Sequence, residues 1–317
     1  MSASTLPARL SAKDFLSVLD LSADEFDQLL ALAAELKALR RTGAPGPRPL
    51  DGRHVAMLFE KPSLRTRVTF VIAVRELGGE VIEPPPDVVF GGRETAEDVA
   101  RNLERWVSGA IVRTFAQDGL ARFAGAASRM HVVNALTDQE HPCQALADVL
   151  TLSERLGNLQ GRRVTYVGDG NNVAVSLAHA GSLAGLRMTF ASPRGYELPD
   201  AVIAACGRIA RFGSTIALTS DPVAAVAGAD AVYTDVWASM GQEQEAESRN
   251  EIFEPFQVNR DLMAAAGPDA LFMHCLPAHR GIEVTDDVMD SPNAVVFDQA
   301  ENRLHAQKAL LALLMGR

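Results

Sequence analysis

Hydroxyl and guanidinium groups are concentrated in one short segment that follows an apolar stretch of the sequence. Ser63, Arg65, Thr66 and Arg67 lie within five residues, shortly after residues 54–59. A helix that starts here would add backbone N–H groups and the positive end of its dipole, and all of these features favour an anion. A serine cap with solvated arginines is the simpler alternative, but two arginines and two hydroxyls together favour a phosphate site.

Other polar residues stand at the ends of further apolar stretches. Arg113 ends one of them and could equally be an ordinary solvent-exposed charge. His141 and Gln144 lie three residues apart at a helix start, where both could donate to a carbonyl or phosphate oxygen. Because Pro142 follows the histidine, an ordinary helix start is the slightly favoured local interpretation. Asp235 could pair with a substrate ammonium or merely cap the next element.

Residues 168–172, which read GDGNN, resemble the strand–turn–helix of a dinucleotide site. Val173 stands where that fingerprint has its third glycine, and the next apolar stretch, 188–191, does not end in Asp or Glu. Both departures weigh against a nicotinamide cofactor. A nucleotide-binding module or redox enzyme is therefore a minor alternative.

Residues 274–280, which read HCLPAHR, place Cys275 among two histidines and invite a zinc interpretation. No second cluster of Cys or His completes four ligands at a usual spacing. A lone cysteine is more often a buried structural residue. We therefore predict no metal site.

The composition excludes several classes of partner. The chain has 317 residues, with 47% hydrophobic and 22% charged residues, which is ordinary for a soluble globular enzyme. A formal net charge of −10 argues against nucleic acid and anionic membranes as partners. The three cysteines have no framework spacing, and the sequence has no secretory signal pattern. It also has no uncharged apolar run near the roughly 18 residues of a membrane span. These features predict a soluble, cytoplasmic protein.

The elements that must position these residues alternate along the chain. A capping box at residues 22–25 starts an amphipathic helix, and short apolar strand candidates then alternate with helical patterns to the C-terminus. Residues 295–297 are expected as the last strand, and residues 300–314 as the last helix, with Arg303 in its first turn. A cation there is unfavourable unless an anion is near. Residues 242–251 could be a solvated helix or a loop.

Strand–helix alternation predicts an α/β fold with doubly wound, mainly parallel sheets. The length favours two domains, and we expect the chain to divide near the helix that starts at His141. The predicted domains are residues 1–140 and 141–299.

Six segments stand in the order of the motifs of the ornithine carbamoyltransferases: FEKPSLRTRVTF, HPCQALADVLTL, GDGNN, DVWASMGQE, MHCLPAHRG and AENRLHAQKALL. The resemblance runs from about Phe59 to the end of the chain. The pair SMG and HCLP is typical of the ornithine enzymes and not of the related aspartate carbamoyltransferases.

This resemblance implies an enzyme that moves the carbamoyl group of carbamoyl phosphate onto ornithine, giving citrulline and phosphate, in arginine metabolism. It implies two domains that close around the substrates, joined by interdomain helices, with the C-terminal helix 300–317 returning to the first. It also implies a homotrimer or a multiple of trimers, with active sites at subunit interfaces, and no metal or organic cofactor.

The resemblance also assigns residues to the substrates. The residues implied for carbamoyl phosphate are Ser63, Leu64, Arg65, Thr66, Arg113, His141, Gln144, Cys275, Leu276 and Arg303. Those implied for ornithine are Asn172, Asp235, Ser239 and Met240. Those implied to take part in the chemistry are Arg113, His141, Asp235 and Cys275.

The chain departs from the family pattern at two places. The family usually has Thr where Leu64 stands, a change that is tolerated if the position acts through its backbone N–H. The family commonly supplies a glutamine from a loop that reaches a neighbouring active site. Residues 84–90 read PPPDVVF and contain no glutamine, so the resemblance does not extend to that contact between subunits.

Two kinds of alternative remain open. The acceptor could be putrescine or an N-acylated ornithine, although Asp235 with the SMG segment favours an α-amino acid. A scaffold protein is the least favoured, since it would not need Ser63, Arg65, Arg113 and Arg303 together with His141.

Overall fold

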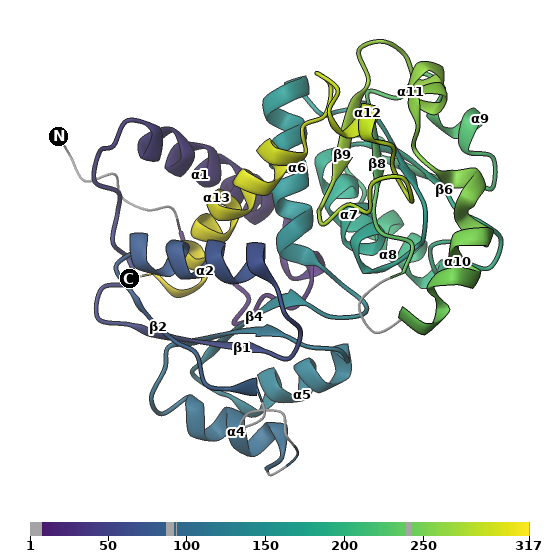
Figure 1. Ribbon diagram of the computed structural model, residues 1–317. Helices are drawn as coiled ribbons and strands as arrows, with labels where there is room; N and C mark the ends of the chain where they lie inside the picture. The colour runs from purple at the N-terminus through teal and green to yellow at the C-terminus, as the bar shows by residue number, and fades with distance from the viewer. Residues whose placement is uncertain (1–7, 87–91, 93, 239–242, 317) are drawn as a thin grey trace. The chain divides into compact units, whose positions relative to one another are not determined.

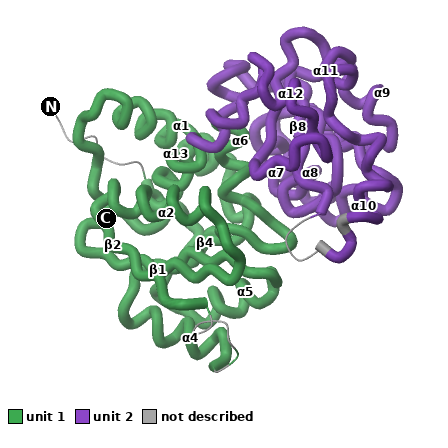
Figure 2. Tube along the Cα trace, viewed as in Figure 1, with its two compact units in different colours: residues 1–150, 302–317 green, residues 151–301 purple. Residues whose placement is uncertain are grey.

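The computed structural model describes residues 8–86, 92, 94–238 and 243–316. It confirms the predicted α/β fold with two parallel sheets. The chain forms two compact units: unit 1 comprises residues 1–150 and 302–317, and unit 2 comprises residues 151–301 (Figure 2). Whereas we predicted a division at 140/141, the units divide inside helices α6 (Pro142–Leu156) and α13 (Val296–Met315).

Unit 1 is built on a four-stranded parallel sheet in the order β2-β1-β3-β4 (Figure 1). Its strands are β1 (His54–Phe59), β2 (Glu80–Ile82), β3 (Gly109–Arg113) and β4 (His131–Leu136). Its helices besides α6 and α13 are α1 (Ala23–Arg41), α2 (Leu64–Glu76), α4 (Ala96–Leu103) and α5 (Gln117–Ala126), with a 3-10 turn at Val18–Asp20.

Both faces of this sheet are covered, which is why its central strands β1 and β3 are buried at every position except His54. Alternate side chains, such as Ala56, Leu58 and Val112, pack against α4 and α5. Figure 1 shows α2 and α13 on the opposite side of the sheet from α4 and α5. The predicted capping box at Ser22 and Glu25 is present at the start of α1.

Unit 2 is built on a five-stranded parallel sheet in the order β7-β6-β5-β8-β9. Its strands are β5 (Arg163–Val167), β6 (Arg187–Ala191), β7 (Thr215–Thr219), β8 (Ala231–Thr234) and β9 (Leu271–His274). Its helices are α7 (Asn172–Ala184), α8 (Asp200–Ile209), α9 (Pro222–Val226), α10 (Ala246–Phe253), α11 (Arg260–Ala266) and α12 (Asp286–Met289), with 3-10 turns at Glu243–Glu245 and Glu254–Phe256.

Three expectations about elements change. The strand predicted at residues 295–297 is wrong, because α13 already begins at Val296 and only Ala294 forms an isolated bridge, to Phe272. Helix α5 was not predicted, since it contains two glycines and lacks a side-chain cap. Residues 242–251 could have been either a helix or a loop, and residues 246–251 of this segment belong to α10.

Each sheet has one point at which the strand order reverses, and ligands of parallel α/β sheets bind beyond the carboxyl ends of the strands at such points. In unit 1 this point lies between β1 and β3, which lead to the Ser63 segment and to Arg113. In unit 2 it lies between β5 and β8, which lead to Asn171 and to Asp235. The topology therefore collects most of the predicted residues at two places, one in each unit.

Across the part of the chain that the structure describes, we find no helix that combines the length and the apolar character needed to cross a bilayer.

Candidate active site

The start of α2 has the features predicted for an anion site. Ser63 is the N-cap, and its hydroxyl oxygen accepts a hydrogen bond from the backbone N–H of Thr66 at 3.3 Å. The first backbone N–H groups of a helix have no acceptor within the helix, so they can donate to a ligand. The side chain of Leu64 is 76% exposed, so this position can contribute to such a site only through its backbone.

Arg303 lies against the start of α2, but not for the reason that the sequence suggested. Because α13 begins at Val296, Arg303 is in the interior of the helix and not in its first turn, so the macrodipole argument was wrong. The side chain is 2% exposed and donates to the Thr66 hydroxyl at 2.7 Å and to the Gln144 side-chain oxygen at 3.0 Å. Gln144 in turn donates to Asp148 at 2.8 Å. These bonds join three segments of unit 1 at the predicted phosphate site.

His141 is buried beside three arginines. Burial lowers the pKa of His141 well below its ordinary value, and the positive charges of Arg303, Arg113 and Arg65 lower it further. The imidazole is therefore neutral near pH 7 and can donate one N–H without carrying charge. Arg113 itself is 6% exposed, so it is not the solvent-facing strand-end arginine of the simpler interpretation.

The depressed pKa of His141 predicts a pH-dependent stability. Below about pH 6.5 the unfolded chain binds a proton at this histidine and the folded chain does not, so the contribution to stability is present above that pH and declines below it. The free energy of unfolding should fall by up to about 1.4 kcal/mol per pH unit from this group.

Urea unfolding of the parent protein and His141→Gln between about pH 5 and pH 6.5 measures this contribution. As the pH falls, the free energy of unfolding of His141→Gln should decline less steeply than that of the parent. The control is His54→Gln, at an exposed position, whose free energy of unfolding should follow that of the parent. Identical pH dependence in His141→Gln and the parent would contradict a neutral, buried His141.

Two further groups, which were not predicted from the sequence, support the unit 1 site. Lys61 is 5% exposed, pairs with Asp138 at 2.5 Å and lies 4.1 Å from the centre of the Phe115 ring. The Glu60 carboxylate accepts a hydrogen bond from the Thr114 hydroxyl. Both contacts hold the segment between β1 and α2 against residues that follow β3 and β4, and a charged pair so far apart in sequence leaves no local signal.

In unit 2, Asp235 follows β8 and is 6% exposed. Its two carboxylate oxygens accept from separate donors: the Asn171 side-chain amide at 3.0 Å and the Cys275 thiol at 3.0 Å. The structure thus brings Asp235 and Cys275 together as predicted, and it adds Asn171. Asn172 is the first residue of α7, while Ser239 and Met240 lie outside the described residues.

The segment after β9 is held by a buried histidine and glutamate. His274 lies 3.2 Å from the Glu283 carboxylate through Nε2, and its Nδ1 accepts from the Leu276 backbone N–H at 2.9 Å. His274, Cys275 and Asp235 bring ligand atoms within 4.8 Å of one another, as a metal site would. Both ring nitrogens of the histidine are already engaged, however, so this trio is poorly suited to hold a metal ion.

The start of α7 does not fit the dinucleotide alternative. The side-chain oxygen of Asn171 accepts from the backbone N–H groups of Val173 and Ala174, which are the donors that a pyrophosphate would need. Gly170 packs against the backbone of Glu197, where a Cβ would come within 2.6 Å of the carbonyl carbon. Gly170 therefore serves a close approach between chain segments, whereas Gly168 has a positive φ of 137°.

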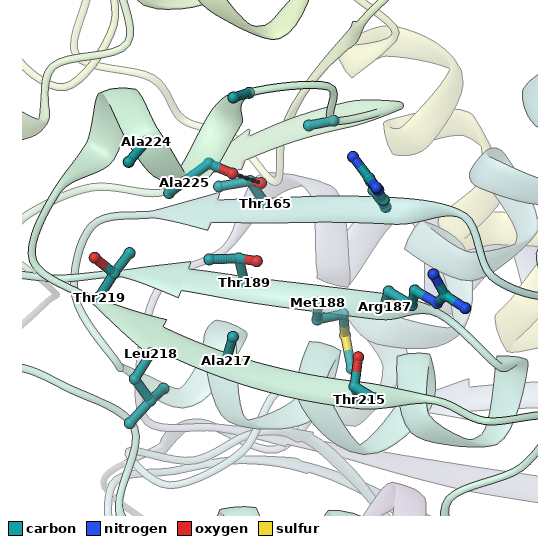
Figure 3. A pocket seen from close by; sticks show the side chains of 13 residues that line it. Thr165, Arg187, Met188, Thr189, Thr215, Ala217, Leu218, Thr219, Ala224 and Ala225 are labelled. Atoms are coloured by element: carbon teal, nitrogen blue, oxygen red, sulfur yellow. Dashed lines mark hydrogen bonds between the residues drawn. The ribbon is translucent and has the colours of Figure 1, made fainter.

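A pocket of about 330 Å³ lies on the sheet of unit 2, away from these residues (Figure 3). Figure 3 shows Thr165, Thr189 and Thr215 projecting from β5, β6 and β7 into it. Its lining includes no carboxylate, histidine or cysteine, so it lacks a group that could move a proton near pH 7. We therefore place the chemistry at the strand ends and not in this pocket.

The comparisons with known proteins agree with the two-unit description. Residues 13–154 match the family model "Aspartate/ornithine carbamoyltransferase, carbamoyl-P binding domain", and residues 160–314 match "Aspartate/ornithine carbamoyltransferase, Asp/Orn binding domain".

Curated proteins and solved structures are similar over nearly the whole chain. The ornithine carbamoyltransferase of Parafrankia sp. (strain EAN1pec) is 52% identical over 96% of this chain and 97% of its own. The protein named "Ornithine carbamoyltransferase, anabolic" from Pyrococcus furiosus is 50% identical over 97% of this chain and 98% of its own. A solved ornithine carbamoyltransferase structure from Pyrococcus furiosus matches with a TM-score of 0.93 and 50% sequence identity, covering 98% of this chain and 99% of its own. One from Thermus thermophilus matches with a TM-score of 0.85 and 43% identity, covering 98% of this chain and 100% of its own.

Proposed function

The chain belongs to the aspartate/ornithine carbamoyltransferase family, and from that premise we propose that it transfers the carbamoyl group of carbamoyl phosphate to the side-chain amine of L-ornithine. The products are L-citrulline and phosphate. The observation that carries the acceptor assignment is the buried carboxylate of Asp235, held by Asn171 and Cys275. A fixed, buried carboxylate favours a cationic ligand, and ornithine offers an ammonium group.

The phosphate of carbamoyl phosphate would bind at the start of α2. Ser63, Arg65 and the backbone N–H of Leu64 are its proposed donors, because helix dipole, donors and charge act together there. Thr66 accepts from Arg303, so its own hydroxyl hydrogen can be donated to the ligand.

The carbonyl oxygen gains negative charge when the amine attacks, and Arg113 and His141 are the proposed groups that stabilise it. A neutral imidazole suits this role, since it donates an N–H and does not compete for the phosphate as a further cation. Gln144, fixed between Arg303 and Asp148, would orient the carbamoyl group. Cys275 and Leu276, which lie in unit 2, are further proposed contacts of that group.

The amine must be neutral to attack, yet an alkyl ammonium has a pKa of about 10.4 in water. We propose that Asp235 binds the ammonium, accepts its first proton and passes it to solvent, while the Cys275 thiol donates to this carboxylate. The amine nitrogen then forms a bond to the carbamoyl carbon, the carbon–oxygen bond to phosphate breaks, and a second nitrogen proton leaves with the phosphate. Asn172, Ser239 and Met240 are the remaining proposed ornithine contacts.

Citrulline formation from carbamoyl phosphate tests the acceptor directly. L-ornithine, putrescine and N-acetylornithine would be compared at equal concentrations with the purified chain. We expect carbamoyl transfer to ornithine and little to the other two. Comparable transfer to putrescine would mean that no α-carboxylate is recognised, and the proposal would fail.

We further propose a role in arginine biosynthesis within the cytoplasm. The relative from Pyrococcus furiosus that is named anabolic, at 50% identity, supports the first part. The three cysteines are buried and none forms a disulfide, which fits a reducing compartment. Burial also raises the pKa of Cys143 to about 12, so this thiol is a packing residue and not a nucleophile.

We propose a homotrimer or a multiple of trimers. Several large apolar side chains of unit 1 are exposed in the single chain, among them Leu64 (76%), Trp106 (67%) and Val68 (45%), as is common where another chain packs. Light scattering should give three times 33.9 kDa or a multiple of that mass. A monomer at working concentrations would contradict the proposal.

A further inference from the structure

Arg249 is a buried cation that has no part in the proposed reaction. It lies on α10 and is 5% exposed. Its Nε donates to the Trp237 carbonyl oxygen, and its guanidinium pairs with the Asp169 carboxylate. The same group packs against the rings of Tyr196 and Phe253, at 4.9 and 5.2 Å from their centres. Because burying a charge is costly, a cation with this many partners is held in one place.

The partners of Arg249 belong to the two segments that hold Asp235. Trp237 is two residues after Asp235 on the segment that leaves β8. Asp169 is two residues before Asn171, whose side-chain amide donates to Asp235. Arg249 therefore ties together the carboxyl ends of β5 and β8, from which Asp235 and its amide donor extend.

The charges around Asp235 give this contact a second consequence. Burial raises the pKa of Asp169, Arg249 opposes that rise, and the negative charge of Asp235 adds to it. The buried carboxylate of Asp235 and the partly buried carboxylate of Asp169 thus repel each other, and Arg249 pairs with the second of them. If Asp169 lost this partner, its charge would compete with Asp235 for a cationic ligand.

Resting on the proposed ornithine activity, we propose that Arg249 is a positioning residue for the amine site: it neutralises Asp169 and fixes the Trp237 backbone, so that Asp235 alone presents a carboxylate to the substrate ammonium. It touches neither the proposed ligand groups nor the reacting atoms. Its removal should therefore affect ornithine and leave carbamoyl phosphate binding unchanged.

Four proteins test the charge pairing: the parent, Arg249→Met, Asp169→Asn and the double variant. Arg249→Met leaves an unpaired carboxylate, and Asp169→Asn leaves an unpaired guanidinium that can pair with Asp235 instead. Each single change should raise the KM for ornithine by roughly 10- to 100-fold, with the Kd for carbamoyl phosphate within about twofold of the parent. The double variant removes both charges, and its KM for ornithine should be at least about tenfold lower than that of Arg249→Met.

Arg260→Met is the matched control, since Arg260 forms an ion pair with Asp287 in the same unit but is exposed. It should leave both constants unchanged. If Arg249→Met does not fold, two other variants still test the charge pairing. Asp169→Asn should impair ornithine binding, and Arg249→Lys, which keeps the charge, should impair it less.

A purely structural role predicts a different pattern. Arg249→Met would then weaken both substrates alike, and the double variant would be no better than the single one. Either result would overturn the proposal. Citrulline formation by the parent is measured first, because its absence would refute the proposed function, whereas an active parent with unaffected variants would refute only the role of Arg249.

Discussion

Replacing Asp235 with Asn is expected to lower kcat/KM for ornithine by roughly 100- to 10,000-fold, the range for losing a group that positions or moves a proton. Asn keeps the size of the side chain but removes the negative charge that would attract the ammonium. It also leaves the Cys275 thiol, which donates to this carboxylate at 3.0 Å, with a neutral acceptor. The Kd for carbamoyl phosphate should change by less than about twofold, because its proposed phosphate donors lie in unit 1.

Asp230→Asn is a suitable control for this experiment. Asp230 immediately precedes β8 and is hydrogen-bonded to the Arg162 side chain and the Arg163 backbone, at 2.8 Å each. The control therefore changes a carboxylate at the opposite end of the strand from Asp235, and the activity with ornithine should stay near that of the parent. Calorimetry with each substrate separates the two effects. Ornithine binding by Asp235→Asn that equals the parent would remove the main chemical support for the acceptor assignment.

Replacing Arg303 with Met is expected to weaken carbamoyl phosphate binding by about 2–5 kcal/mol, or roughly 30- to 5,000-fold. Arg303 is one of the three arginines whose charge acts on His141, and it donates to both Thr66 and Gln144. The change would remove positive charge from the site and free two side chains that are proposed to contact the ligand. Met fills a similar length of space, so the packing of α13 is largely kept.

The matched control is Lys308→Met on the same helix. Lys308 is also buried, with 5% of its surface exposed, but it pairs with Glu76 at 2.7 Å and is not proposed to contact the ligand. Both variants lose a buried cation from α13, so a general weakening of the helix would appear in both. An equal rise of the Kd for carbamoyl phosphate in the two variants would show that Arg303 acts through stability and not at the site.

Much of the site could be predicted from the sequence because its residues follow apolar strands. A parallel sheet collects the carboxyl ends of its strands at one edge, so a polar cluster that follows a strand is already assigned to that edge. The Ser63 segment, Arg113 and Asp235 were placed in this way. The six motifs in order then indicated the family, although each is modest evidence alone.

Element boundaries were less well determined where tertiary contacts override local preference. The start of α13 was placed too late because residues 295–297 are two valines and a phenylalanine, and β-branched and aromatic residues favour a strand in isolation. This error also produced the wrong argument for Arg303. Arg303 nevertheless lies at the predicted phosphate site, because it contacts Thr66 and Gln144 from another helix and not because of a helix dipole.

The fold class, the family and the side-chain types available for the chemistry could all be inferred from the order of residues along the chain. Which charges meet depends on how the elements pack. Thr66 and Arg303 are 237 residues apart, and Asp169 and Arg249 are 80 apart. Sequence patterns report on neighbours within one element, whereas such pairs form only when several elements pack. The neutral state of His141 has the same origin, because it is buried and the charges of Arg65, Arg113 and Arg303 reach it from three separate segments of the chain.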